Sequence, residues 1–120
     1  MIRIVHLFDV KKGVEENSFM EWLDAKLEVA ARRFGCVDRK TWVLLDGFTG
    51  NYLQPYGNVR DRPKYVNEAY WDDLDGAKRF REWLVSTPEG REIHDRWFGS
   101  IQNHTVLRYV EGWARHPSDE

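Results

Sequence analysis

The chain has 120 residues, 42% of them hydrophobic and 32% charged, so it can form one folded domain and is not a disordered chain. Its net charge of −2 and its isoelectric point near 6.1 provide no attraction to nucleic acid or to an acidic membrane surface. A single cysteine excludes an intrachain disulfide. The sequence has no secretory-leader pattern and no stretch that could span a membrane, and we expect a cytoplasmic protein.

A strand followed by a helix is expected at the start of the chain. Residues 2–10 read as the strand, and Lys-Lys-Gly breaks the pattern after it. Ser18 and Glu21 have the spacing of a capping box, which predicts that the helix begins at Ser18. Gly35 is placed to end the helix in a left-handed conformation. The predicted buried stripe recurs every three or four residues: Phe19, Leu23, Leu27, Ala30 and Phe34.

Two further strands are predicted around a long connection. They span residues 37–45 and 64–71, and residues 46–63 between them are rich in Gly, Asn and Pro. This connection also carries Tyr52, Leu53 and Tyr56, large side chains that would otherwise remain in water. We therefore expect the connection to be ordered by packing of these side chains on the rest of a dimer.

The second half of the domain is predicted to contain two helices and a last strand. Asp72 and Asp73 offer an N-cap for the first helix, and Thr87 followed by Pro88 marks the start of the next one. Gly99 is expected to end that helix, and residues 103–113 to form the last strand. Residues 1–113 would then be a single domain with a polar tail over residues 114–120.

The resulting order, β-α-β-β-α-α-β, predicts an α+β ferredoxin-like sandwich with a four-stranded antiparallel sheet and helices on one face. All four strands carry large apolar side chains at both odd and even positions, so the uncovered face also needs to be buried. That face measures about 450 Å², as large as the biggest apolar patch a soluble monomer normally exposes. We therefore expect a homodimer formed through the sheet face.

Two alternatives with the same order of elements are less well supported. An RNA-recognition module needs a basic residue, a glycine and alternating aromatics in its third strand. Residues 64–71, KYVNEAYW, have no glycine and include the acidic Glu68. A regulatory ligand-binding module would have to act on another chain, since there is no second domain.

Local motifs point to one superfamily. The segment YWDDLDGAK at residues 70–78 resembles the aromatic-then-acidic step from strand to helix in the dimeric α/β-barrel superfamily. The run STPE at residues 86–89, with His94 in the next helix, is similar to a second segment of that superfamily. The superfamily includes cofactor-independent antibiotic-biosynthesis monooxygenases, haem-degrading monooxygenases, EthD-like proteins, lactone isomerases and stress-responsive proteins. The resemblance implies a barrel made by two sheets, and no catalytic residue is transferred from it.

Histidines are the candidate acid–base groups. His94 and His6 are the expected catalytic residues, because a histidine in a cavity can titrate near neutral pH. Each could instead be a packing residue satisfied by a polar neighbour. The sequence has neither a His-x-x-x-His nor a Cys-x-x-Cys pair, so we expect no metal site, and we expect no bound cofactor. Arg108 and Glu68 lie in apolar strands and are expected to pair with each other or to face the rim.

Aromatic residues make up 14% of the chain and suit a flat hydrophobic ligand. The expected substrate-binding residues are Trp42, Tyr65, Trp71, His104 and Arg108, the last as an anchor for a carboxylate or phenolate oxygen. Two functions remain open. One is a small enzyme, a cofactor-independent monooxygenase or isomerase acting on an aromatic or polyketide-like molecule. The other is a non-catalytic dimer that binds a hydrophobic molecule or supports a stress response.

Overall fold

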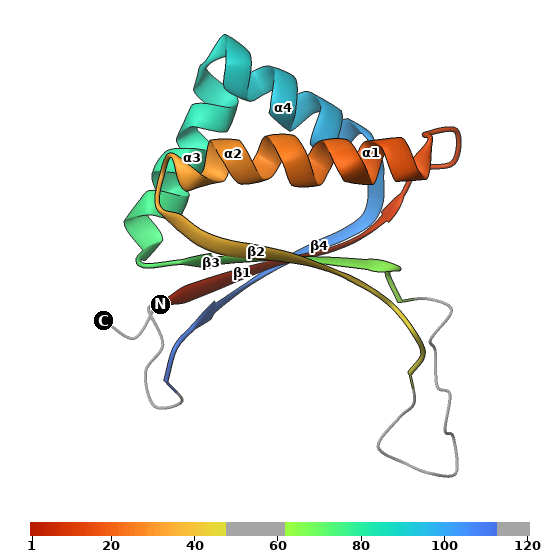
Figure 1. Ribbon diagram of the computed structural model, residues 1–120, viewed down its shortest axis with the longest axis horizontal. Coiled ribbons are helices and arrows are strands. Elements are labelled where there is room, and N and C mark those ends of the chain that lie inside the picture. The colour runs from red at the N-terminus through yellow and green to blue at the C-terminus, as the bar shows by residue number, and fades with distance from the viewer. Residues whose placement is uncertain (48–61, 113–120) are drawn as a thin grey trace.

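All helices of the computed structural model lie on one face of a curved, four-stranded antiparallel sheet (Figure 1). The structure describes residues 1–47 and 62–112. Its elements are β1 (Ile2–Val10), α1 (Glu16–Trp22), η1 (Leu23–Leu27), α2 (Glu28–Arg32), β2 (Cys36–Val43), β3 (Tyr65–Trp71), α3 (Leu74–Ser86), α4 (Pro88–Gly99) and β4 (Ile101–Val110). The elements α1, η1 and α2 follow one another without a break and correspond to the single first helix that the sequence predicts. The predicted order of elements and the ferredoxin-like fold are therefore confirmed.

The position of β1 inside the sheet decides which side chains meet the helices. The strand order is β2-β3-β1-β4, so β1 is paired with β3 on one side and β4 on the other. His6 faces the helical layer, where its ring lies 4.6 Å from that of Trp97. Arg3 points to the opposite, open face and pairs with Glu68. Because side chains alternate along a strand, the even residues of β1 face the helices and the odd ones face away.

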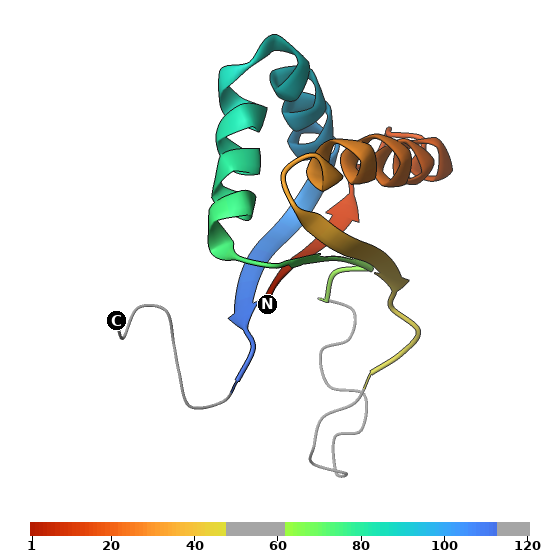
Figure 2. The same ribbon diagram turned by 60° about the vertical axis from the view of Figure 1, so that its left-hand side comes forward.

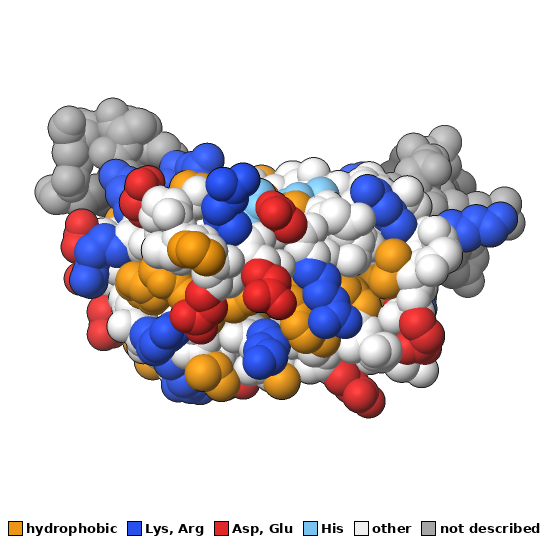
Figure 3. Space-filling view, turned by 90° about the horizontal axis from the view of Figure 1, so that it is seen from above, with side chains coloured by type: hydrophobic (Ala, Val, Ile, Leu, Met, Phe, Trp, Pro, Cys, Tyr) orange, Lys and Arg blue, Asp and Glu red, His pale blue; other side chains and the backbone are white. Residues whose placement is uncertain are grey.

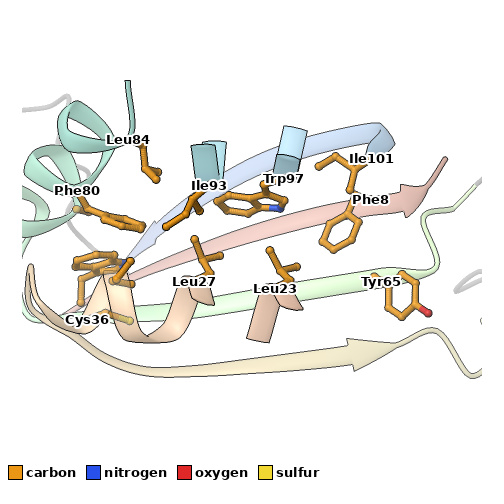
Figure 4. Close-up of a cluster of buried hydrophobic side chains, with 14 of the residues drawn as sticks. Phe8, Leu23, Leu27, Cys36, Tyr65, Phe80, Leu84, Ile93, Trp97 and Ile101 are labelled. Atoms are coloured by element: carbon orange, nitrogen blue, oxygen red, sulfur yellow. The ribbon is translucent and has the colours of Figure 1, made fainter. Parts of the chain in front are cut away.

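The core fills the space between the helices and the inward face of the sheet. Figure 4 shows Leu23 and Leu27 of the first helix pointing toward Trp97 and Ile93 of α4. Phe8 of β1 is fully buried in the same cluster. Figure 2 shows α3 and α4 standing at an angle to α1–α2, so the helices pack on the sheet in different directions.

The helix starts follow the predicted signals except at α1. Asp73 Oδ1 accepts a hydrogen bond from the Gly76 amide at 2.9 Å, and Thr87 Oγ1 accepts one from Gly90 at 3.0 Å. The expected N-cap at Ser18 is wrong. Glu15 is the N-cap, and its carboxylate accepts from the Ser18 amide at 2.6 Å. A longer side chain three residues earlier thus supplies the capping oxygen, and the helix begins at Glu16.

Several element boundaries also differ from expectation. β2 ends at Val43 rather than at residue 45, and Phe34 lies beyond the last helical residue, in the turn before β2. β4 begins at Ile101, two residues early, because Ile101 pairs with Val10 beyond a bulge. Gly35 has the expected left-handed conformation, with φ of +105°. The predicted packing of the 46–63 connection falls mostly on residues 48–61, outside the described residues, as does the 113–120 tail.

The open face of the sheet combines exposed apolar side chains with one buried carboxylate. Trp42 is 54% exposed and Tyr109 50% exposed, so this face lacks the cover that its apolar character calls for. Glu68 is only 3% exposed and accepts from Trp42 Nε1 at 2.9 Å and from Tyr70 Oη at 3.1 Å, in addition to its ion pair with Arg3. These donors offset the cost of burying the carboxylate.

Of the two arrangements expected for Glu68 and Arg108, pairing with each other or facing the rim, the pairing is therefore wrong. In the sheet register Glu68 lies beside Val5, whereas Arg108 lies beside Ile4, so the two side chains project from opposite faces. Arg108 is exposed on the edge strand β4.

In the part of the chain that the structure describes, no helix has the length and apolar character needed to cross a bilayer.

Replacing Gly90 by alanine should destabilise the fold. A Cβ at this position would collide with the Trp83 carbonyl oxygen and lie 2.8 Å from Leu84 Cα, where α4 starts against the end of α3. We expect urea denaturation to show a loss of about 2–3 kcal/mol in the free energy of unfolding. Gly99→Ala is the control, because a Cβ there would meet no atom within 4 Å. Equal stabilities of the two variants would contradict the close packing of α3 and α4.

Candidate functional site

A cavity of about 700 Å³ lies between the inward face of the sheet and the helical layer. Strands β1, β3 and β4 contribute its floor, and α3 and α4 much of its walls. Its apolar lining includes Ile4, Leu27, Ala69, Trp71, Phe80, Leu84, Trp97 and Phe98. Its polar lining is formed by His6, Arg39, Lys78, Arg81, His94 and Arg108. The cavity is therefore mostly apolar with a few polar groups, as is usual for sites that bind small molecules.

His6 is a titratable side chain that lines the cavity from the inward face of β1. Burial lowers the pKa of His6 to about 3, and the nearby charges of His104 and Arg39 act in the same direction. The ring is therefore neutral at physiological pH. Its Nδ1 lies 2.8 Å from Nε2 of His104, so one of the two rings donates a hydrogen bond to the other. A neutral imidazole in this position can accept a proton from a ligand at its other ring nitrogen, Nε2.

The two other candidate histidines lie farther out. His104 is half-buried on β4, and burial lowers its pKa as well. Its ring is 5.3 Å from that of Phe98, and the ring of His94 lies 4.7 Å from the same phenyl ring in a tilted arrangement. His94 lines the cavity with a side chain that is 35% exposed, and its Nδ1 lies 3.1 Å from Asp95. Seen from the helix side, histidine side chains reach the surface among mixed acidic and basic groups (Figure 3).

A polar relay runs from the sheet to the first helix beside the cavity. Asn67 Nδ2 donates to Thr41 Oγ1 at 3.1 Å, and Thr41 Oγ1 donates to Asp24 Oδ1 at 2.9 Å. Asp24 belongs to the π-helical turn η1, a local widening that is frequent at functional sites. The same carboxylate oxygen lies 4.0 Å from Nη2 of Arg39. The relay fixes Asp24 close to a basic side chain of the cavity wall.

Arg39 and Trp97 hold buried donors that the protein leaves unused. Within the described residues, Nε and Nη2 of Arg39 and Nε1 of Trp97 are buried without a hydrogen-bond partner. Burial lowers the pKa of Arg39, and the charge of Asp24 opposes this effect. Donors of this kind are rare in folded proteins because each costs free energy when unpaired.

The cavity brings together some of the residues predicted from the sequence and leaves others apart. His6, His94, Trp71 and Arg108 all line it, and His104 touches it through His6. The remaining two lie elsewhere. Trp42 projects from the opposite face of the sheet, and the Tyr65 hydroxyl donates to Glu16 at 2.8 Å near the start of α1.

Sequence reasoning did not single out Arg39, Asp24 or Trp97 as site residues. The sequence places Arg39 in a strand and Trp97 in a helix, as the structure does. The neighbouring sequence does not distinguish a residue that lines a cavity from one that packs in the core. Alternation along β2 could have grouped Arg39 with Thr41 on one face. Among the described residues, no three His, Cys, Asp or Glu side chains cluster closely enough to hold a metal ion.

The sequence matches no protein-family model and no curated protein sequence. Solved structures with similar folds do exist. A protein from Arabidopsis thaliana is 12% identical, with a TM-score of 0.67 over 97% of this chain and 100% of that chain. SnoaB, a cofactor-independent oxygenase from Streptomyces nogalater, is 18% identical, with a TM-score of 0.62 over 99% of this chain and 97% of that chain.

A third similar structure is a dimeric ferredoxin-like protein of unknown function from Thermobifida fusca. It is 15% identical, with a TM-score of 0.59 over 91% of this chain and 89% of that chain. Together these likenesses confirm the ferredoxin-like fold. At such low identities they show the fold alone.

The pKa of His6 predicts a specific loss of stability in acid. The unfolded chain binds a proton at His6 below about pH 6.5, whereas the folded chain does so only near pH 3. Protonation therefore favours the unfolded state between these values, by about 2–3 kcal/mol at pH 4.5 relative to pH 7. Urea denaturation at a series of pH values should show this loss in the wild type and a correspondingly shallower one in His6→Asn. Parallel pH profiles for the two proteins would contradict the assignment of a buried, neutral His6.

Proposed function

We propose that the protein is an enzyme that removes an acidic hydrogen from an apolar, aromatic or polyketide-like molecule bound in the cavity. The reaction would proceed without a bound cofactor and lead to oxygenation or isomerisation. The observation that carries the proposal is the neutral His6 ring, buried at the cavity and bonded to His104. SnoaB, described as a cofactor-independent oxygenase, supports it because the same fold can host such chemistry.

The histidine pair offers a route for the proton. His6 Nε2 would accept it from the substrate to give an imidazolium, whose Nδ1 hydrogen then passes to Nε2 of His104, 2.8 Å away. His104 is half-buried, so the proton can continue to solvent. The substrate keeps the electron pair of the broken bond as an enolate or phenolate. That anion then either reacts with O2 or is reprotonated at another carbon.

The low pKa of His6 is compatible with this role. In the empty cavity the imidazolium form is disfavoured by burial. Once a proton has moved from the substrate, the imidazolium lies beside the new anion, and their attraction offsets part of the desolvation cost. Trp97 Nε1, which has no partner among the described residues, can donate to the developing oxyanion. The apolar walls exclude water and strengthen both interactions.

We also propose that two copies associate through the open face of the sheet. Exposed apolar side chains lie on this face, including Trp42, Leu107 and Tyr109. The similar protein from Thermobifida fusca is described as dimeric, which supports this arrangement. A sheet face of this size, together with its rim, approaches the lower end of the range for stable interfaces, about 1,200–2,000 Å².

Sedimentation at micromolar concentration should therefore give about twice the chain mass of 14.3 kDa. Leu107→Asp places a charge on the open face and should shift the protein to monomer. Val29→Asp is the control, because Val29 is exposed on the helical layer and its substitution should leave the dimer intact. A monomeric wild type, or a monomer produced equally by both variants, would contradict an interface at the open face.

The acid–base role can be tested with bicyclic and tricyclic ketones that have acidic C–H groups, such as 2-tetralone and anthrone. Exchange of the acidic hydrogen with D2O is followed by NMR, and O2 uptake is recorded in parallel, each with a protein-free blank. We expect His6→Ala to lower the protein-dependent rate by about 10²–10⁴-fold, the usual value of general-base catalysis. Wild-type rates in both His6→Ala and His94→Ala would disprove acid–base catalysis by histidine. Ligand binding without any exchange would favour a non-catalytic binding protein.

A further inference from the structure

The charged side chains that line the cavity are all basic. Arg39 comes from β2, Lys78 and Arg81 from α3, and Arg108 from β4. No Asp or Glu is found among the described lining residues. This separation does not follow from composition, because the chain has 20 acidic and 18 basic residues. A cleft with one sign of charge and apolar walls attracts ligands of the opposite charge.

Among these basic groups, only the Arg39 side chain is shown to be withdrawn from water and left without hydrogen-bond partners. It is 4% exposed, and its nearest carboxylate, Asp24, is 4.0 Å away and 54% exposed. The facing oxygen of Asp24 already accepts a hydrogen bond from Thr41. Within the described residues, Arg39 Nε and Nη2 have no hydrogen-bond partner at all. A guanidinium stays charged in a protein, so this arrangement is costly unless another group completes it.

The contrast with Glu68 shows that the fold can satisfy a buried charge. In the sheet register Arg39 is paired with Ala69 of the neighbouring strand β3. Glu68 is the residue next to Ala69 on that strand, and it faces the other side of the sheet. It is bonded to Arg3, Trp42 and Tyr70. The unpaired state of Arg39 is therefore specific to the cavity side of the sheet.

The unpaired atoms of Arg39 have the geometry of a carboxylate receptor. Nε and Nη2 lie on one edge of the guanidinium, and their two N–H groups match the two oxygens of a carboxylate. We call this pair of N–H groups the Arg39 fork. In the sheet register Arg39, Ala69, Ile4 and Arg108 form one row across all four strands, and all of them line the cavity. The small side chain of Ala69, next to Arg39, leaves room for a ligand group above the sheet.

From these observations we infer that the ligand of this cavity is an apolar molecule with a carboxylate, and that the Arg39 fork binds this carboxylate. This inference rests on the proposed function, because it names the class of molecule that the same cavity takes. A rotation of the guanidinium turns the fork toward the ligand, whose apolar body lies along the aromatic and aliphatic walls. Lys78 and Arg81, on α3, attract the anion to the cavity without having to touch it.

The inference can be tested with 2-naphthoate and 2-naphthamide, which have the same ring system and differ in charge. Titration calorimetry should show that the wild type binds 2-naphthoate about 10- to 100-fold more tightly than the amide. In Arg39→Met this preference should disappear while the amide affinity is kept. Arg39→Lys should retain only part of it, since a lysine lacks the planar fork. Arg79→Met, which removes an equal charge from an exposed ion pair with Asp75, is the control and should leave the preference unchanged.

Thermal stability provides a second readout. Since Arg39→Met replaces an unsatisfied buried charge by an apolar side chain of similar length, we expect its Tm to rise by about 2–6 °C. A purely structural arginine would give a lower Tm. Equal affinities of the wild type for the two probes, or a preference that Arg108→Met abolishes and Arg39→Met keeps, would overturn the inference. These outcomes leave the proposed function standing, whereas failure of both probes to bind would count against the two proposals together.

Discussion

The alternation of side chains along β1 is the constraint on which the rest of the structure depends. Helices cover one face of the sheet only, so each residue of this internal strand belongs either to the core and cavity or to the open face. A shift of one residue in its pairing would exchange the two sets, moving His6 out of the cavity and Arg3 into it. The pairing of β1 with strands on both sides prevents such a shift. The geometry of the candidate site is therefore a consequence of strand register.

The same alternation separates charges that would otherwise neutralise each other. Glu68 and Arg39 lie on adjacent strands, but the carboxylate faces the open side and the guanidinium faces the cavity. On its own side Glu68 finds enough donors to be fully bonded. On the cavity side, within residues 1–47 and 62–112, Arg39 has only the distant oxygen of Asp24 beside it. The cavity side, where we propose that a ligand binds, thus retains unpaired hydrogen-bond donors. On the open face, where we propose no ligand, the buried carboxylate is satisfied.

Much of the fold could be predicted from the sequence because its signals are local. The N-cap at Thr87 depends on residues within one helical turn, and it is observed as expected. The expected N-cap at Ser18 was wrong for an equally local reason, since the carboxylate of Glu15 caps the Ser18 amide and the helix begins at Glu16, ahead of the expected position. The pairing expected between Glu68 and Arg108 was wrong for a different reason. It depends on the register of three strands, which no short stretch of sequence determines.

The cavity was partly predictable for the same physical reason. His6 lies between Ile4 and Phe8 on its own strand face, so it could be placed on an apolar face, but Val5 and Leu7 make the other face apolar as well, and the pattern does not tell which face the helices cover. Arg39 has no such pattern, because its surroundings come from a π-helical turn and from a strand far away in the sequence. The open face and the cavity are nevertheless formed by the same strands. Val5 and His6, for example, are consecutive residues of β1, and their side chains project to opposite faces. A second copy that covers the open face would leave each cavity whole within its own chain, and association could affect the site only through the backbone that both faces have in common.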